Sequence, residues 1–197
     1  MHLSRYLSAL VFITPILCAQ NYTKIPVTVS VGDYSRLGYK RPDVSFQMGA
    51  EHFRQKYWLN VSGHFNPTDK IYYGNVTQMG VSSELFWKSR RGFFAGGGGN
   101  IRNITFHDLG PNQSYWTTGP TASCGLLVRN LRVTVRGRFW EYDRRYDVRG
   151  VSWSLLYDIK GKVRVGFGQG VYSVYSKGAH INFGTNLVGS AIIGYVF

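Results

Sequence analysis

Several residues and patterns that define other protein classes are scarce in this sequence. Only 2 of its 197 residues are cysteine, so disulfides cannot hold a small secreted fold together. No uninterrupted apolar run approaches the roughly 20 residues of a transmembrane helix, which excludes a helical membrane bundle. Charged residues make up 17%, below the usual ~25%, while aromatic residues reach 16%, so a disordered chain is excluded as well. The length then favours a single folded domain.

The start of the chain has the layout of a secretory signal peptide. Arg5 supplies the positive charge, a short apolar core follows, and Ala19 is a small residue at the expected cleavage site. Acylation of Cys18 is the rival interpretation, but a leucine precedes this cysteine where a lipoprotein site has a small residue. We therefore expect residues 1–19 to be removed and residues 20–197 to form one domain in a bacterial envelope.

Apolar and polar residues then alternate with a period of two, and no apolar stripe with the helical period of about 3.6 accompanies them. The alternation is clear at Val27, Val29 and Val31, which are separated by threonine and serine. Short basic connections alternate with longer, more varied ones. The pattern predicts ten strands, or eight if the first or the glycine-rich fifth segment is misassigned: 24–33, 43–53, 56–66, 75–87, 92–106, 116–128, 131–142, 147–157, 162–173 and 183–197.

A meander of such strands leaves two open edges unless it closes into a barrel. One face of the strands is almost free of charge over about nine to eleven residues, the length with which a tilted strand crosses a membrane. The other face mixes charged residues with small ones, such as Gly166, Gly168 and Gly170. We predict an all-β fold, a closed antiparallel up-and-down transmembrane barrel with its apolar face outward. Aromatic residues near the strand ends would form its interfacial girdles: Tyr34, Tyr57, Phe86, Trp87, Phe93, Phe94, Trp116, Trp140, Tyr157 and Tyr195.

The end of the chain carries a further pattern. Gly189, Ile193, Tyr195 and the final Phe197 share one face of the last predicted strand. This ending resembles the C-terminal signal of bacterial outer-membrane barrels, and together with the signal peptide and the alternating loops it resembles the small OmpA/OmpX-like kind. The resemblance implies a monomer in a Gram-negative outer membrane, in contact with lipid and lipopolysaccharide. It also implies periplasmic chaperones and recognition of these four residues by the barrel-assembly machinery.

The polar face predicts a charged lumen. Its charged residues are Arg132, Arg136, Arg138 and Arg164, with Glu51 and Glu84 as candidate partners. The interior of a barrel of eight to ten strands is nearly filled by side chains, and an unpaired buried charge is costly. One hypothesis is therefore a lumen plugged by an arginine–glutamate network. The alternative is a narrow anion-preferring pore, because the arginines outnumber the glutamates.

Other functions receive less support. His107 and Asp108, at a predicted loop end, leave a rim hydrolase of lipid A or phospholipid as a minor alternative, without any family motif. The basic residues cluster at turns and on one strand face, so no nucleic-acid partner is expected, and no histidine–cysteine spacing predicts a metal or cofactor. The expected role is structural or adhesive. A soluble, glycosylated secreted β-domain stays a further alternative because of five sequons, at Asn21, Asn60, Asn75, Asn103 and Asn112.

Overall fold

The computed structural model describes residues 22–33, 43–54, 56–69, 76–107, 113–141, 146–176 and 182–197. Within these ranges no helix is long and apolar enough to cross a membrane. The regular structure of the described residues is β-strand throughout: β1 (Tyr22–Lys24), β2 (Pro26–Asp33), β3 (Asp43–Phe53), β4 (Tyr57–Asp69), β5 (Val76–Lys88), β6 (Phe93–Phe106), β7 (Gln113–Val128), β8 (Leu131–Glu141), β9 (Tyr146–Ile159), β10 (Val163–Ser176) and β11 (Asn182–Val196).

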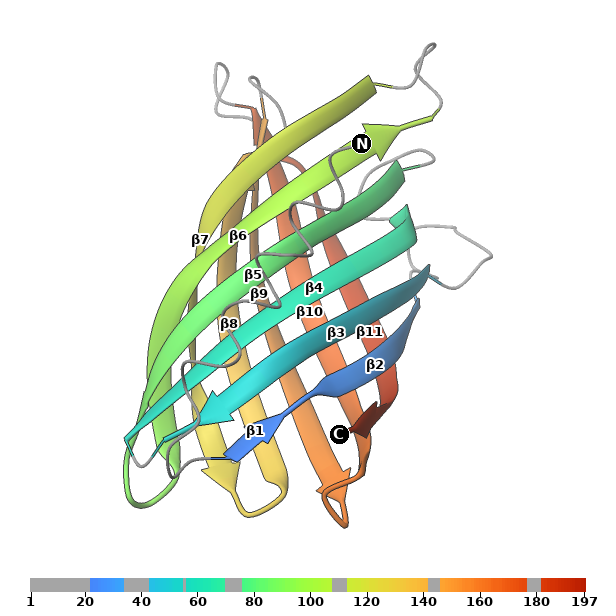
Figure 1. Ribbon diagram of the computed structural model, residues 1–197. Helices are drawn as coiled ribbons and strands as arrows, with labels where there is room; N and C mark the ends of the chain where they lie inside the picture. Colours follow the sequence, from blue (N-terminus) through green and yellow to red (C-terminus); the bar gives the residue numbers. More distant parts are fainter. Residues whose placement is uncertain are drawn as a thin grey trace, which may run out of the picture.

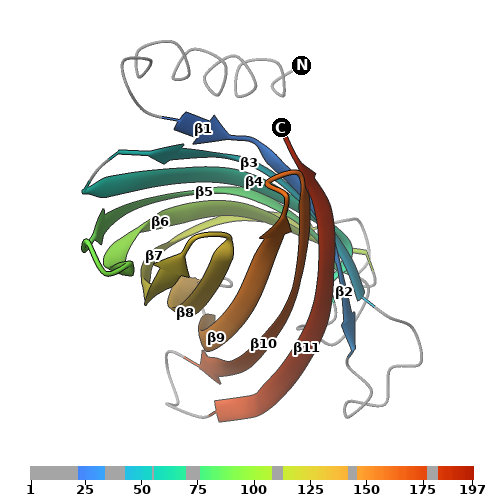
Figure 2. The same ribbon diagram turned by 90° about the horizontal axis from the view of Figure 1, so that it is seen from below.

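The strands form one closed antiparallel ring (Figures 1 and 2). Each strand pairs with the next along the chain from β2 to β11, and β11 then pairs with β2. The segments β1 and β2 act as one strand, because Tyr22 opposite Phe53 and Val27 opposite Met48 keep the same register on β3. Ile25 between them exchanges backbone hydrogen bonds of 3.0 and 3.1 Å with Phe197. Eleven segments therefore make a ten-stranded barrel.

This ring confirms the predicted fold class and the ten-strand count. The first segment and the glycine-rich fifth segment are both strands, so the eight-strand alternative does not apply. The expected strand boundaries agree with the observed ones to within three residues. The predicted signal peptide, residues 1–19, lies outside the described residues.

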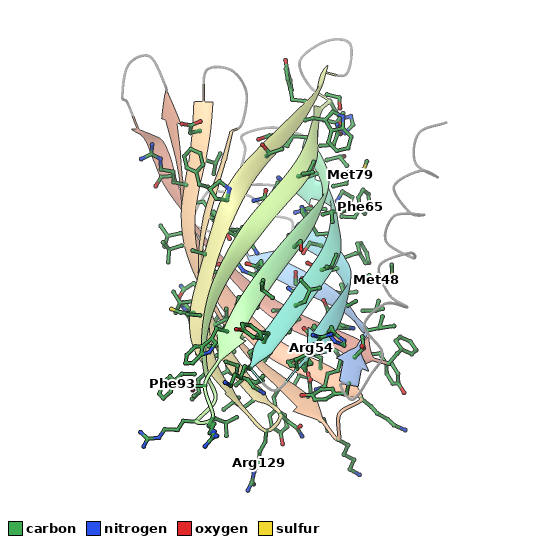
Figure 3. The ribbon with its side chains drawn as sticks, turned by 60° about the vertical axis from the view of Figure 1, so that its left-hand side comes forward. Met48, Arg54, Phe65, Met79, Phe93 and Arg129 are labelled. Carbon is green, nitrogen blue, oxygen red and sulfur yellow. The ribbon has the colours of Figure 1, made fainter. Side chains whose placement is uncertain are left out.

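Tight turns connect the strands at one end of the barrel. Between β7 and β8 the turn consists of Arg129 and Asn130, and Arg129 has a positive φ of 51°. The turn between β9 and β10 uses Lys160 at φ 48° and Gly161 at φ 70°. Positive φ angles give a short loop the twist that matches the strands it joins. Figure 3 shows Arg129 at the tip of this end, which we call the turn end.

The two faces of the strands differ in chemistry as predicted. Large apolar side chains cover the outer wall, and Figure 3 shows Met48, Phe65 and Met79 pointing away from the barrel. Val135, Phe167 and other outward residues are also exposed. The inner wall is mainly polar and buried, and includes both Glu51 and Glu84. The barrel is thus inverted relative to a soluble protein, whose apolar side chains lie inside.

Two members of the predicted aromatic girdles lie inside instead. Phe86 and Phe94 are only 1% and 3% exposed, and they pack in the lumen with Trp58. The physical reason is strand parity: Phe86 shares a face with Glu84, and Phe94 shares a face with Gly96. Other girdle residues are exposed on the outer wall as expected, namely Tyr57, Trp87, Phe93, Trp116, Tyr157 and Tyr195. Tyr34 and the side chain of Trp140 lie outside the described part.

Candidate functional site

An aromatic cluster fills part of the lumen near the turn end. Trp58 of β4 lies at its centre, with ring centroids 5.2 Å from Phe53, 4.6 Å from Phe86 and 5.2 Å from Phe94. Glycines on the neighbouring strands make room for these rings. A Cβ atom on Gly125 would lie 2.8 Å from Cζ of Phe94, closer than real contacts allow. The small residues of the inner wall thus accommodate aromatic side chains.

A network of ion pairs lies beside the aromatic cluster. Arg164 of β10 donates to Glu51 at 2.7 and 3.0 Å and to Asp158 at 2.7 and 3.0 Å. Arg132 of β8 donates at 2.9 Å to Oε1 of Glu51, the oxygen that also accepts from Arg164 at 2.7 Å. Lys24 of β1 donates to Asp158 at 2.7 Å. The guanidinium carbon of Arg132 also lies 4.9 Å from the ring centroid of Trp58. The charges of this network are therefore paired, as burial requires.

The network crosses the barrel. In the ten-stranded ring, β3 and β8 are five strands apart in either direction, so they are diametrically opposed. A single guanidinium–carboxylate contact nevertheless joins Arg132 on β8 to Glu51 on β3. Both side chains are largely buried, at 11% and 4% exposure.

A second ion pair lies elsewhere on the inner wall. Arg136 of β8 pairs with Glu84 of β5, and Glu84 is only 1% exposed. Ser123 of β7 joins them, because it donates to Glu84 at 3.1 Å and accepts from Arg136 at 3.1 Å. This pair links strands that are three positions apart in the ring.

Five of the six lumen residues singled out in the sequence therefore take part in ion pairs, namely Glu51, Glu84, Arg132, Arg136 and Arg164. The sixth, Arg138, also lines the lumen, but it forms no ion pair within the described ranges.

Sequence reasoning missed Asp158, Lys24 and Trp58. Asp158 falls in the predicted connection between the expected strands 147–157 and 162–173, yet it is directly opposite Arg164 in the β9–β10 hairpin. Opposite charges at paired positions of a hairpin attract each other, so the sequence alone could have indicated Asp158 as a partner of Arg164. Lys24 and Trp58 gave no such signal, because their contacts depend on strands far away in the chain.

A cavity of about 300 Å³ occupies the lumen beyond the network. Its walls extend from the ion-paired residues to His64 on β4, Arg102 on β6 and Arg138 on β8. Gly168 and Gly170 line it, and the ring of Tyr172 lies over Gly170 and Gly150. The inner-wall glycines thus make room for the ring of Tyr172 and also border the cavity.

Other candidate residues are placed as follows. Nε2 of His107 lies 2.8 Å from Oγ1 of Thr77, while Asp108 lies outside the described residues. Asn60 and Asn103 belong to strands and are each 8% exposed, and the other three sequons begin at residues outside the described part. The described residues contain no group of three or more histidine, cysteine, aspartate or glutamate side chains suited to a metal ion.

The C-terminal residues lie on the outer wall. Ile193, Tyr195 and Phe197 are 62%, 43% and 70% exposed, and the rings of Tyr195 and Phe197 are in edge contact at 4.8 Å. Gly189 lies on the same strand face, opposite Asp33 of β2. The apolar ending is thus built into the strand that closes the ring.

The outer wall, the polar lumen and the tight turns are those of a small β-barrel of the outer-membrane type. No family model matches the chain, and no curated protein matches its sequence. Among solved structures it is similar to a porin, with 10% identity and a TM-score of 0.40, covering 93% of this chain and 64% of that one. It thus spans less than two thirds of that porin.

Two further structures have lengths closer to that of this chain. The Ail attachment invasion locus protein of Yersinia pestis is 14% identical, with a TM-score of 0.36, covering 90% of this chain and 97% of that one. The outer membrane phospholipase A from Escherichia coli is 14% identical, with a TM-score of 0.37, covering 92% and 96%. The assignment of this chain to the closed barrels follows from its own strand ring.

Proposed function

We propose that this protein is an integral β-barrel of a Gram-negative outer membrane with a structural or adhesive role, and that it is not an enzyme. The inverted distribution of side chains supports the membrane location, because only a lipid environment stabilises such an apolar outer wall. Lipid and lipopolysaccharide are then its immediate partners. Basic residues at the turn end, such as the exposed Arg54 and Arg129, suit anionic headgroups there.

The proposed state of the lumen is closed to ions. The observation that carries this proposal is the contact between Arg132 and Glu51 across the full width of the ring. The aromatic cluster around Trp58 occupies the space beside it. A closed barrel of this kind acts through its outer surface and loops rather than by transport. Chaperones and the barrel-assembly machinery, acting on the exposed ending at Tyr195 and Phe197, are its proposed assembly partners.

Two measurements on the refolded protein test this proposal. A membrane barrel resists SDS until heated, because its closed ladder has no edge from which to unzip, so boiling shifts its gel mobility. Planar-bilayer recording of the same sample then reports on the lumen, and we expect no steady ion conductance. Folding in plain buffer without a heat-dependent shift would contradict the membrane location and favour a soluble secreted β-domain. Steady conductance would contradict only the closed lumen.

A narrow anion-preferring pore is the second candidate, and the position of Arg138 favours it. This arginine lines the cavity without an ion pair among the described residues, so the lumen carries surplus positive charge. Replacing Arg136 and Arg138 by glutamine separates the two candidates. A pore would lose anion selectivity, whereas a plugged barrel would mainly lose stability. An unchanged selectivity in a conducting double variant would rule out a pore whose anion preference is set by these two arginines.

A further inference from the structure

Basic side chains are concentrated on the surface of the turn end. Seven exposed arginines and lysines lie at the four tight turns there, and none of them forms an ion pair within the described ranges. We call these residues the basic collar: Arg54, Lys56, Arg90, Arg91, Arg129, Lys160 and Lys162. The collar therefore presents positive charge to whatever surrounds this end of the barrel.

Among the described residues, no exposed aspartate or glutamate balances this charge at the turn end. Glu51 and Asp158 are near this end, but they are only 3% and 5% exposed and already bind Arg164. Glu84 is buried in the lumen and pairs with Arg136. The other described acidic residues are at or near strand ends at the opposite end of the barrel: Asp33, Asp43, Asp69, Glu141 and Asp147. A surface of one charge sign attracts anions.

The collar is distributed around the barrel rather than gathered on one side. Its four turns follow β3, β5, β7 and β9, which alternate with the other strands around the ring. Each turn region is also joined to the next strand pair by a backbone hydrogen bond of 2.6–3.0 Å. These bonds, donor first, are Lys88 to Lys56, Leu127 to Gly92, Asp158 to Asn130 and Val196 to Lys162. A partner that surrounds the barrel, as a lipid leaflet does, can therefore contact every turn.

Aromatic side chains on the outer wall indicate the depth of the collar in a membrane. Lys56 directly precedes the exposed Tyr57, and Arg91 is two residues before the exposed Phe93. Figure 3 shows Phe93 projecting from the outer wall and Arg129 beyond it, at the tip of the turn end. Interfacial aromatic rings lie at the level of lipid headgroups, and long basic side chains extend along apolar surface towards polar groups. The collar is therefore at the depth of the lipid phosphates.

We propose that the basic collar selectively binds anionic phospholipid, the lipid class whose headgroup has a net negative charge, in the leaflet at the turn end. The inference rests on the proposed membrane location and goes beyond contact with lipid in general, because it names a lipid class and the residues that select it. Arginine and lysine donate to phosphate oxygens, and each cation near an anionic leaflet adds to the attraction. A zwitterionic lipid offers the same phosphate, but its own ammonium group cancels the charge.

Electron spin resonance of spin-labelled lipids tests this selectivity on the refolded protein in phosphatidylcholine vesicles. Lipids in contact with the barrel give a motionally restricted signal, so the association of spin-labelled phosphatidylglycerol can be compared with that of spin-labelled phosphatidylcholine. At low salt we expect phosphatidylglycerol to be preferred about two- to fivefold. The preference should nearly vanish at about 1 M salt, where the Debye length falls to about 3 Å.

A matched pair of variants assigns the preference to the collar. The neutral variant changes one collar residue at each turn: Arg54→Gln, Arg90→Gln, Arg129→Gln and Lys162→Gln. The control keeps the charge at the same positions: Arg54→Lys, Arg90→Lys, Arg129→Lys and Lys162→Arg. The neutral variant should lose most of the preference and the control should retain it. Both variants exchange exposed side chains that form no described ion pair, and the heat-dependent gel shift verifies that they fold.

Equal association of the two lipids with the folded wild-type protein would overturn the inference. So would a preference that the neutral variant retains, because the collar would then not be its source. If the lipids associate equally but soluble poly-glutamate binds the wild type and not the neutral variant, the collar would be assigned to an acidic protein segment instead. Absence of the heat-dependent gel shift in the wild type would count against the proposed membrane barrel itself.

Discussion

The ring of Phe86 lies against Gly96 on the neighbouring strand. A Cβ atom on Gly96 would lie 2.7 Å from Cα and 2.8 Å from Cδ1 of Phe86, and it would overlap the carbonyl oxygen of Leu85. The two residues are directly paired between β5 and β6. The glycine-rich run of β6 is therefore a structural element that lets an aromatic residue pack flat against the inner wall. A strand without side chains at this point bends and allows close approach.

Substitutions within the glycine run should differ sharply in effect. Gly96→Ala forces the new methyl group into the Leu85–Phe86 backbone, so we expect a loss of about 1–3 kcal/mol in the free energy of unfolding. Gly99→Ala is the matched control, because a Cβ there is 3.7 Å from the carbonyl oxygen of Gly119. Urea unfolding in micelles, followed by tryptophan fluorescence, measures both. Equal stability of the two variants would contradict the inward packing of Phe86.

Removing the charge of Glu51 should destabilise the barrel. Glu51→Gln leaves Arg132 without a carboxylate partner among the described residues and Arg164 with Asp158 alone, and breaking a buried ion pair costs about 3–5 kcal/mol. The temperature at which the heat-resistant gel band disappears should fall clearly. Arg129→Gln, at an exposed turn position, provides the comparison and should leave this temperature unchanged. A Glu51→Gln barrel as heat-resistant as the wild type would show that the network contributes little.

The centre of the aromatic cluster should be equally sensitive. Trp58 is 2% exposed and contacts three other rings, so Trp58→Ala should cost about 3–5 kcal/mol in unfolding free energy. Trp87→Ala removes the same side chain from the outer wall, where the tryptophan is 52% exposed and detergent replaces it. Equilibrium unfolding of both variants in the same micelles gives the difference. If Trp87→Ala proved the more damaging, the lumen would not be the main packed core.

Two outward valines provide a test of membrane embedding. Val135 and Val128 are each 44% exposed, but Val128 is the last residue before the β7–β8 turn while Val135 lies mid-strand. In a bilayer, Val135→Arg should cost about 2–4 kcal/mol and Val128→Arg about 0–1 kcal/mol, because the cost falls towards the interface. Folding titrations into lipid vesicles measure both. A soluble domain would tolerate the two substitutions alike.

Much of this architecture could be predicted from the sequence because strands encode their faces locally. The two-residue period of each strand assigns Glu51, Glu84, Arg132 and Arg164 to the polar face without any knowledge of the fold. The same parity already assigned Phe86 and Phe94 to the inner face. Their predicted place in the aromatic girdles is wrong because it follows from their position near the strand ends, whereas the inner face follows from their immediate neighbours.

The strand segments, their inner and outer faces and the basic turns could be predicted from the sequence, since each depends on residues within a few positions of one another. The structure excludes the eight-strand alternative that the sequence left open. Which inner residues contact one another depends instead on the closed ring. Ring closure brings Glu51 to Arg132 across the lumen and Lys24 to Asp158, pairs that are 81 and 134 positions apart in the chain. Such contacts depend on strand tilt and register around the whole barrel, which no local pattern encodes.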